Sequence, residues 1–226
     1  LTGKHSHANG FINNSTTFNG DQLTFPKLLQ QNGYQTAMIG KWHLVSDPQG
    51  FDHWEILPGQ GDYYNPTFIQ MNGEKVQVEG YATNIITDKA IDWIENQRDE
   101  SKPFCMLLHH KAPHRTWMPD TCDLELFADK TFPLPENFYD NYEGRLAAQK
   151  QKMNIANDME IVYDLKMADK ENEIHSGMYE KWGRGMYDGS RMTPEQKAAW
   201  DAHYDPIIAK FKKDKLTGKA LAEWKF

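Results

Sequence analysis

The first clear hydrophobic pattern of the chain predicts a helix followed by a strand. Thr24 is a suitable N-cap, and Pro26 suits the first helical turn. We expect Leu28–Leu29 to face a core and Gly33 to end the helix. The apolar segment Gln35–Ile39 then predicts a strand. This order is typical of α/β folds.

A second helix–strand pair follows. Isoleucine and alanine recur at helical spacing through Tyr81–Gln97, which predicts a helix. Phe104–His109 is a short apolar run bounded by Pro103 and a polar stretch, and it predicts a buried strand. Basic clusters follow both strands, at Gly40–His43 and at His109–Arg115. Open α/β sheets bind ligands beyond the carboxyl ends of their strands, so both clusters are candidates for a site on one rim.

The remaining segments have weaker patterns. Val45–Val78 is rich in Gly, Pro, Asn and Asp, which predicts long ordered loops with a hairpin at Asn72–Gly73. Gly144–Met167 predicts a polar helical region with no strong apolar face. Thr193–Phe211 opens with a cap and a proline and predicts a helix, and Leu216–Phe226 predicts another.

Composition narrows the class of partner. The 226-residue chain has a formal net charge of −7 and no basic stripe, which argues against nucleic-acid binding because phosphate contacts need clustered Lys and Arg. No apolar run approaches the roughly 20 residues of a membrane-spanning helix. The cysteines, Cys105 and Cys122, indicate neither a disulfide framework nor a cysteine-rich zinc site.

Motifs in a fixed order carry a resemblance to a known enzyme family. The second signature of the sulfatases, formylglycine-dependent hydrolases of the alkaline-phosphatase superfamily, is similar to Gly33–His43, with the sequence GYQTAMIGKWH. Leu1–Gly3 resembles the end of their first signature, and His109–His114 resembles their third cluster. The resemblance covers residues 1 to about 120 and is weaker beyond, where Met186–Ala199 resembles an insertion of some bacterial and glycosaminoglycan-directed members.

The resemblance implies an α/β fold with an alkaline-phosphatase-like mixed sheet flanked by helices. Residues 1–120 would form part of the catalytic domain, and residues 121–226 a helical and irregular insertion that caps the substrate entrance. The formylglycine would lie a few positions before Leu1, and the metal-binding strand would follow Phe226. We therefore expect an internal fragment that is inactive alone, with a calcium ion and formylglycine in the parent enzyme and no metal ligand in this chain.

The family resemblance also implies roles for basic residues. Lys41 would contact the sulfate and the formylglycine. His43 would hold the formylglycine hydroxyl and act as the base that regenerates the aldehyde, a role that suits a group with a pKa near neutral. His114 would lie beside the bridging oxygen and assist the leaving alcohol, and Lys111 would pair with sulfate or an anionic sugar.

Other polar residues carry weaker predictions. Asp62 and Tyr63 are expected to contact a sugar, because a carboxylate accepts hydrogen bonds and an aromatic ring offers a flat face. For Arg115 and Trp117, substrate contact and packing are equally compatible with the sequence. The residues expected to be structural or on the surface are His5, His7, Asp47, Asp52, His53, His109 and His110.

The sequence therefore predicts a sulfuric ester hydrolase acting on a small-molecule or oligosaccharide sulfate ester, such as a glycosaminoglycan unit. The alternatives are a phosphonate or phosphate-ester hydrolase of the same superfamily and a non-catalytic module that binds sulfated sugars. The family resemblance implies a periplasmic or secreted location.

Overall fold

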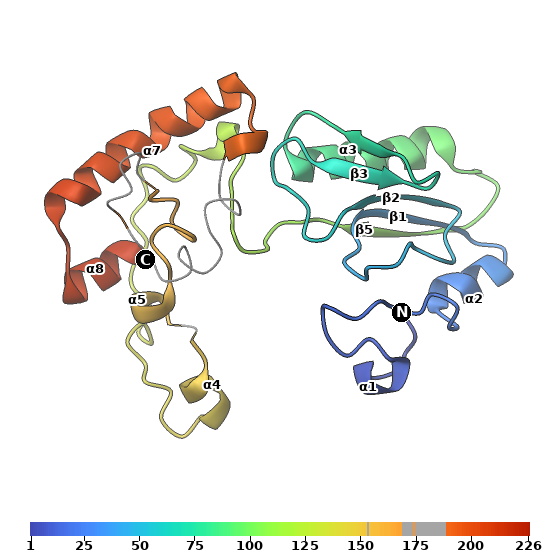
Figure 1. Cartoon of the computed structure of the whole chain (residues 1–226), viewed down its shortest axis with the longest axis horizontal. Coiled ribbons are helices and arrows are strands. Elements are labelled where there is room, and N and C mark those ends of the chain that lie inside the picture. Colours follow the sequence, from blue (N-terminus) through green and yellow to red (C-terminus); the bar gives the residue numbers. More distant parts are fainter. Residues whose placement is uncertain (153, 169–173, 175–188) are drawn as a thin grey trace. The chain divides into compact units, whose positions relative to one another are not determined.

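The structure, a computed structural model, describes residues 1–152, 154–168, 174 and 189–226. It divides into two compact units, Leu1–His114 and Arg115–Phe226 (Figure 1). The division falls close to the boundary predicted at residue 120. The assignment of the parts as a catalytic-domain segment and an insertion stays a prediction. Within the described ranges, every helix is too short or too polar to cross a bilayer.

The first unit is built on a five-stranded mixed sheet with the order β4-β3-β2-β1-β5. The inner strand β1 (Gln35–Lys41) is parallel to both of its neighbours, β2 (His53–Leu57) and β5 (Phe104–His109). The hairpin of β3 (Thr67–Gln70) and β4 (Lys75–Gln77) extends the other edge in antiparallel fashion. The predicted α/β class with a mixed sheet is confirmed.

One face of the sheet is covered by α3 (Ala82–Asp92), which continues into a π-helical turn, η1 (Trp93–Gln97). Ile86 and Trp93 of this segment are fully buried, and they pack with strand residues such as Phe68. Burial of side chains of this size stabilises the fold by about 1.5–3 kcal/mol each. The predicted helix at 81–97 is thus the element that links β4 to β5 across this face.

The opposite face carries aromatic residues from the turn after β1. Trp42 and Phe51 pack edge to face with ring centroids 5.9 Å apart, in one cluster with Met38, Trp54 and Ile56. Figure 1 shows α1 (Ser6–Asn9) and α2 (Phe25–Gln31) on this side of the sheet. Strand β1 is therefore packed on both faces of the sheet, since Ala37 and Ile39 belong to one cluster and Met38 to the other.

Several local predictions differ from the structure. The segment Val45–Val78, predicted to form loops with a hairpin, also contains β2, which pairs with β1. Leu28 does not face a core, because its side chain is 43% exposed. Strand β5 lies at an edge and is only partly buried, with Phe104 and Leu108 exposed, so it is not the fully buried strand that its apolar run indicates.

The second unit is mainly irregular chain packed by helices. Helix α7 (Pro194–Asp214) starts at Thr193 with a complete capping box, and α8 (Gly218–Lys225) follows, as the sequence predicts. The other described helices of this unit are η2 (Thr121–Asp123), α4 (Leu146–Lys150), α5 (Ile155–Asp158) and η4 (Gly189–Arg191). In the stretch predicted to be a polar helical region, Gly144–Met167, the described residues are helical only in α4 and α5. The resemblance noted for Met186–Ala199 lies partly outside the described residues.

Candidate active site

The parallel strands β1 and β5 bring the basic clusters of the sequence to one rim. Gly40 of β1 is the register partner of His109 in β5, so the residues that follow each strand emerge side by side. Gly40 has a φ of +106°, and a Cβ at this position would meet the His109 carbonyl oxygen at 2.0 Å. Only glycine fits this close approach, which sets the spacing of the two clusters.

The cluster after β1 contains Lys41 and His43. Between them Trp42 is buried, and its Nε1 donates to the Ser46 carbonyl at 2.6 Å, which anchors the turn. Lys41 Nζ donates to Oε1 of Gln60 at 2.5 Å, and Nε2 of Gln60 lies 3.4 Å from His43 Nε2. Lys41 and His43 therefore point to a common partner.

The cluster after β5 contains Lys111 and His114. Lys111 is only 8% exposed, and its Nζ donates to the Gln60 carbonyl at 3.1 Å and lies 4.7 Å from the centre of the Tyr63 ring. The Tyr63 hydroxyl donates to the His114 carbonyl at 2.7 Å. These contacts place Lys111 and His114 against the same loop that contacts the β1 cluster.

The loop that joins both clusters runs from Pro58 to Asn65. Gly59 and Gly61 have positive φ values, and the Gly61 N–H donates to the Pro58 carbonyl at 2.9 Å in a tight turn around Gln60. Tyr63 stacks on Tyr81 with ring centroids 6.0 Å apart and is 4% exposed. The long loop predicted from the Gly and Pro content is thus a structural bridge between the strand ends.

Electrostatics at this rim favour an anion. Burial lowers the pKa of Lys41, and burial together with the charge of Lys41 lowers the pKa of Lys111 to about 8, although Asp62 opposes this shift. The pKa of His43 is lowered by burial first, and then by the charges of Lys41 and His114. Clustered cations that are partly desolvated bind an oxyanion more strongly than exposed ones. The neutral form of His43 is favoured and can accept a proton.

The predicted site residues are therefore brought together. Lys41, His43, Lys111 and His114 converge, and their functional roles stay predictions. Asp62 is close enough for its charge to act on Lys111. The structure gives the Tyr63 ring a packing role against Tyr81 and Lys111, so its direct sugar contact also stays a prediction.

Gln60 is the residue that sequence reasoning missed. It contacts Lys41, His43 and Lys111, but a single glutamine has no spacing or charge pattern that marks it. The only signal in the sequence is its place between Gly59 and Gly61, where a tight turn can direct one side chain inward.

The other candidates have structural or surface positions. His5 and His7 are exposed and stack on each other at 5.8 Å. Asp52 accepts hydrogen bonds from the backbone N–H of Thr36 at 2.7 Å and from its hydroxyl. His109 Nδ1 lies 3.2 Å from the Lys41 carbonyl. These contacts give the four residues structural or surface roles, as the sequence predicts.

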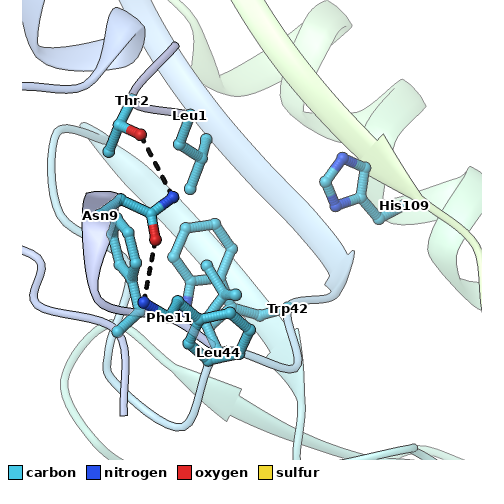
Figure 2. A pocket seen from close by; sticks show the side chains of 8 residues that line it. Leu1, Thr2, Asn9, Phe11, Trp42, Leu44 and His109 are labelled. Carbon is cyan, nitrogen blue, oxygen red and sulfur yellow. Dashed lines mark hydrogen bonds between the residues drawn. The ribbon is translucent and has the colours of Figure 1, made fainter. Parts of the chain in front are cut away.

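A pocket of about 250 Å³ adjoins the turn after β1 (Figure 2). It is lined by Leu1, Thr2, Asn9, Phe11, Phe18, Trp42, Leu44 and His109. Asn9 connects two other residues of the pocket lining. Its Nδ2 donates to the Thr2 hydroxyl at 3.4 Å, and its Oδ1 accepts from the Phe11 N–H at 2.9 Å. The Leu1 carbonyl accepts from the Phe25 N–H at 3.0 Å. Leu1 and Thr2 are thus hydrogen-bonded to Phe25 and Asn9, and they line this pocket together with Trp42 and His109.

A metal ion has no evident ligand set in this part of the protein. Calcium takes six to eight oxygen ligands, with carboxylates prominent among them. Among the residues that the structure describes, no group of three or more His, Cys, Asp or Glu side chains is placed to hold a metal ion. The described residues therefore do not fit a metal ion by themselves.

Comparison with protein families identifies the chain. The family model described as Sulfatase matches residues 1–152. The chain belongs to the sulfatase family. The resemblance carried by the strand-end motifs is thereby confirmed, and the sulfatase match extends past His114 into the second unit.

Individual relatives agree with the family. This sulfatase chain is 53% identical over 230 residues to an N-acetylglucosamine-6-O-sulfatase of Bacteroides thetaiotaomicron, covering 100% of the chain and 40% of that protein. It is 26% identical over 163 residues to an N-acetylglucosamine-6-sulfatase of Homo sapiens, covering 61% of the chain and 29% of that protein.

A solved structure matches the whole fold. It is described as a complex with its substrate D-glucosamine-2-N,6-O-disulfate, and it aligns with a TM-score of 0.87 at 53% identity, covering 100% of this chain and 45% of that one. The Bacteroides relative and this solved structure both match the sulfatase chain from end to end, but each of them is more than twice as long as the chain.

Proposed function

We propose that the chain forms part of the active site of an enzyme that hydrolyses sulfate esters, with a 6-sulfated glucosamine unit as the substrate of the parent enzyme and no turnover by residues 1–226 alone. The observation that carries this proposal is the convergence of Lys41 and His43 with Lys111 and His114 at the carboxyl ends of β1 and β5. The choice of sugar is supported by the relatives, described as N-acetylglucosamine-6-sulfatases, and by the glucosamine disulfate in the matching structure.

The lysines provide the electrostatic part of the mechanism. Sulfate-ester hydrolysis breaks the bond between sulfur and the bridging oxygen, and negative charge grows on the sulfate oxygens and on the leaving alcohol. Lys41 and Lys111 each present an ammonium group to an oxygen atom of Gln60, so both groups are directed towards an acceptor at this rim. Fixed donors of this kind typically contribute about 10²–10³ in rate each.

The histidines provide the proton transfers. His114 would give a proton to the bridging oxygen as the alcohol leaves, which requires its protonated form. His43 would take a proton as base, which requires its neutral form. The lowered pKa of His43, caused by burial and by the charges of Lys41 and His114, agrees with this division of roles.

The family resemblance also carries proposals about cofactors and location. In the family, a hydrated formylglycine supplies the nucleophile and a calcium ion stabilises the sulfate. The formylglycine would belong to the first signature of the family, whose last three residues Leu1–Gly3 resembles. A periplasmic or secreted location rests on the resemblance alone.

A graft tests the proposed function directly. Residues 1–226 would replace the matching segment of the Bacteroides N-acetylglucosamine-6-O-sulfatase, a replacement that the 53% identity over the whole chain makes feasible. Release of inorganic anion would be measured from N-acetylglucosamine 6-sulfate and from N-acetylglucosamine 6-phosphate at equal concentrations. The same graft with Lys41→Met is the matched control, because methionine retains most of the apolar stem without the charge.

The outcomes separate the alternatives. We expect sulfate release at a rate at least about 10²-fold above the control, and slower release of phosphate. Faster release from the phosphate ester would favour a phosphate-ester hydrolase. A graft that binds the 6-sulfate, as judged by calorimetry, but releases no sulfate would favour a sulfated-sugar binding module.

A further inference from the structure

The side chain of Gln60 connects the residues that are central to the proposed chemistry. Its Oε1 accepts a hydrogen bond from Lys41 Nζ at 2.5 Å, and its Nε2 lies 3.4 Å from His43 Nε2. Its backbone oxygen accepts from Lys111 Nζ at 3.1 Å. One loop residue therefore contacts basic groups from both strand ends.

The chemistry of the partners fixes the orientation of the amide. A lysine ammonium group only donates hydrogen bonds, so the Gln60 atom facing Lys41 is the amide oxygen. The amide nitrogen then faces His43 and only donates, so His43 Nε2 must accept. A ring nitrogen that accepts carries no proton, and the proton of the neutral imidazole is therefore on Nδ1.

We propose that Gln60 is a positioning residue that selects this tautomer of His43 and keeps the lone pair at Nε2. The inference deepens the proposed function and rests on it for the role of His43 as a base. An imidazole side chain in water favours the other tautomer, in which the proton sits on Nε2 and that atom cannot accept. The hydrogen bond from Gln60 thus favours the Nδ1–H tautomer, which the isolated imidazole ring does not favour.

The loop holds Gln60 in place for this task. Gly59 and Gly61 adopt positive φ values on either side of it, and the Pro58 carbonyl closes the turn. A side chain on Gly61 would collide with Leu57, since its Cβ would lie 2.6 Å from Leu57 Cδ1. Lys111 fixes the backbone oxygen of Gln60 from the other side. The backbone of Gln60 is therefore held in a tight turn, which places the start of its side chain at the strand ends.

The tautomer can be measured by nitrogen NMR on the full 226-residue chain. With ¹⁵N-labelled histidine, the chemical shifts of Nδ1 and Nε2 report which atom carries the proton, and a His43→Asn variant assigns the signals. Spectra would be recorded above the titration of His43 for the wild type, Gln60→Leu and Gln60→Glu. Gln31→Glu is the matched control, because Gln31 is exposed at the end of α2.

We expect His43 to carry its proton on Nδ1 in the wild type and in Gln31→Glu. Gln60→Leu removes the amide and should give a mixture of tautomers. Gln60→Glu offers only acceptors, so it should move the proton to Nε2. Unchanged signals from the other histidines would show that the variants are folded.

An identical His43 tautomer in the wild type and both Gln60 variants would overturn the inference. The result does not depend on hydrolysis, so it is distinguishable from the grafting experiment. An active graft with an unresponsive tautomer would remove the role of Gln60 and leave the proposed function intact. An inactive graft with a responsive tautomer would remove the function and leave the contact.

Discussion

At the scale of single residues, the site lysines differ in how strongly their surroundings control their charge. Lys41 is half-buried, whereas Lys111 is 8% exposed and lies over the Tyr63 ring. Burial is the main reason why the pKa of Lys111 falls to about 8, and the charge of Lys41 adds to it. The protonation of Lys111 therefore changes in a pH range that is accessible to experiment.

This shift predicts a pH-dependent affinity for sulfate. Sulfate binds best when Lys111 is charged, and above about pH 8 the free protein loses that proton, so binding must also take up a proton. We expect the affinity of the chain for inorganic sulfate to be constant from pH 6 to about 7.5. It should then fall by up to tenfold for each pH unit above about 8. Isothermal titration calorimetry at constant ionic strength measures this change.

Two variants control this measurement. Lys111→Met should bind sulfate more weakly and lose the fall in affinity above about pH 8. Lys102→Met removes an exposed lysine near the other end of β5 and should follow the wild type. Wild-type affinity that does not change between pH 7 and 10 would contradict the combined claim that Lys111 loses its proton in this range and that its charge binds the anion.

The sequence was enough to predict the basic residues of the site, but it did not predict Gln60, which contacts three of them. Lys41, His43, Lys111 and His114 occur in recognisable motifs after apolar runs, so their positions along the chain are enough to mark them as candidates. Gln60 has no such signal, because its contacts exist only after the turn at Gly59–Gly61 folds back on the strand ends. Sequence patterns locate strand ends well and loop conformations poorly.

At the scale of elements, the apolar runs predicted β1 and β5, and their pairing in the sheet places the basic clusters together. Strand β2 was missed. Its sequence, His53–Leu57, mixes polar and apolar residues inside a segment rich in Gly and Pro, and it becomes a strand through parallel pairing with β1. Tertiary pairing of this kind overrides local propensity.

The close approach of β1 and β5 at Gly40 predicts that the substitution Gly40→Ala strongly lowers the free energy of unfolding. Gly40→Ala adds a Cβ that would meet the His109 carbonyl oxygen at 2.0 Å, in a backbone with φ of +106°. We expect the free energy of unfolding to fall by about 3 kcal/mol or more, from left-handed strain plus overpacking. Urea unfolding followed by tryptophan fluorescence measures it.

Gly73→Ala is the matched control for Gly40→Ala. Gly73 also has a positive φ, +83°, but no atom lies within 4 Å of the position of its Cβ. Its substitution should cost only the backbone strain of about 1–2 kcal/mol. Equal costs for the two variants would mean that the sheet opens readily at the site and that Gly40 does not set the strand spacing.

At the scale of the whole molecule, the predicted chemistry is confined to the first unit, Leu1–His114. In the second unit, Arg115 forms an ion pair within the unit. The Arg115 guanidinium makes two hydrogen bonds of 2.5 Å to the Asp164 carboxylate and lies 5.1 Å from the centre of the Tyr163 ring. Packing, one of the alternatives left open for Arg115, is therefore what the structure shows. The sequence predicted less of this unit because its core is built from scattered residues of irregular chain, such as Val162 and Met167.

Sulfate release by the graft, with and without His43→Ala, tests the central claim most directly. The claim is that the strand ends of this chain form part of a sulfatase active site. If it is right, His43→Ala should lower kcat/KM for N-acetylglucosamine 6-sulfate by about 10²–10⁴-fold, because the proton-transfer group is lost. A graft that releases sulfate equally well with alanine at position 43 would contradict the account.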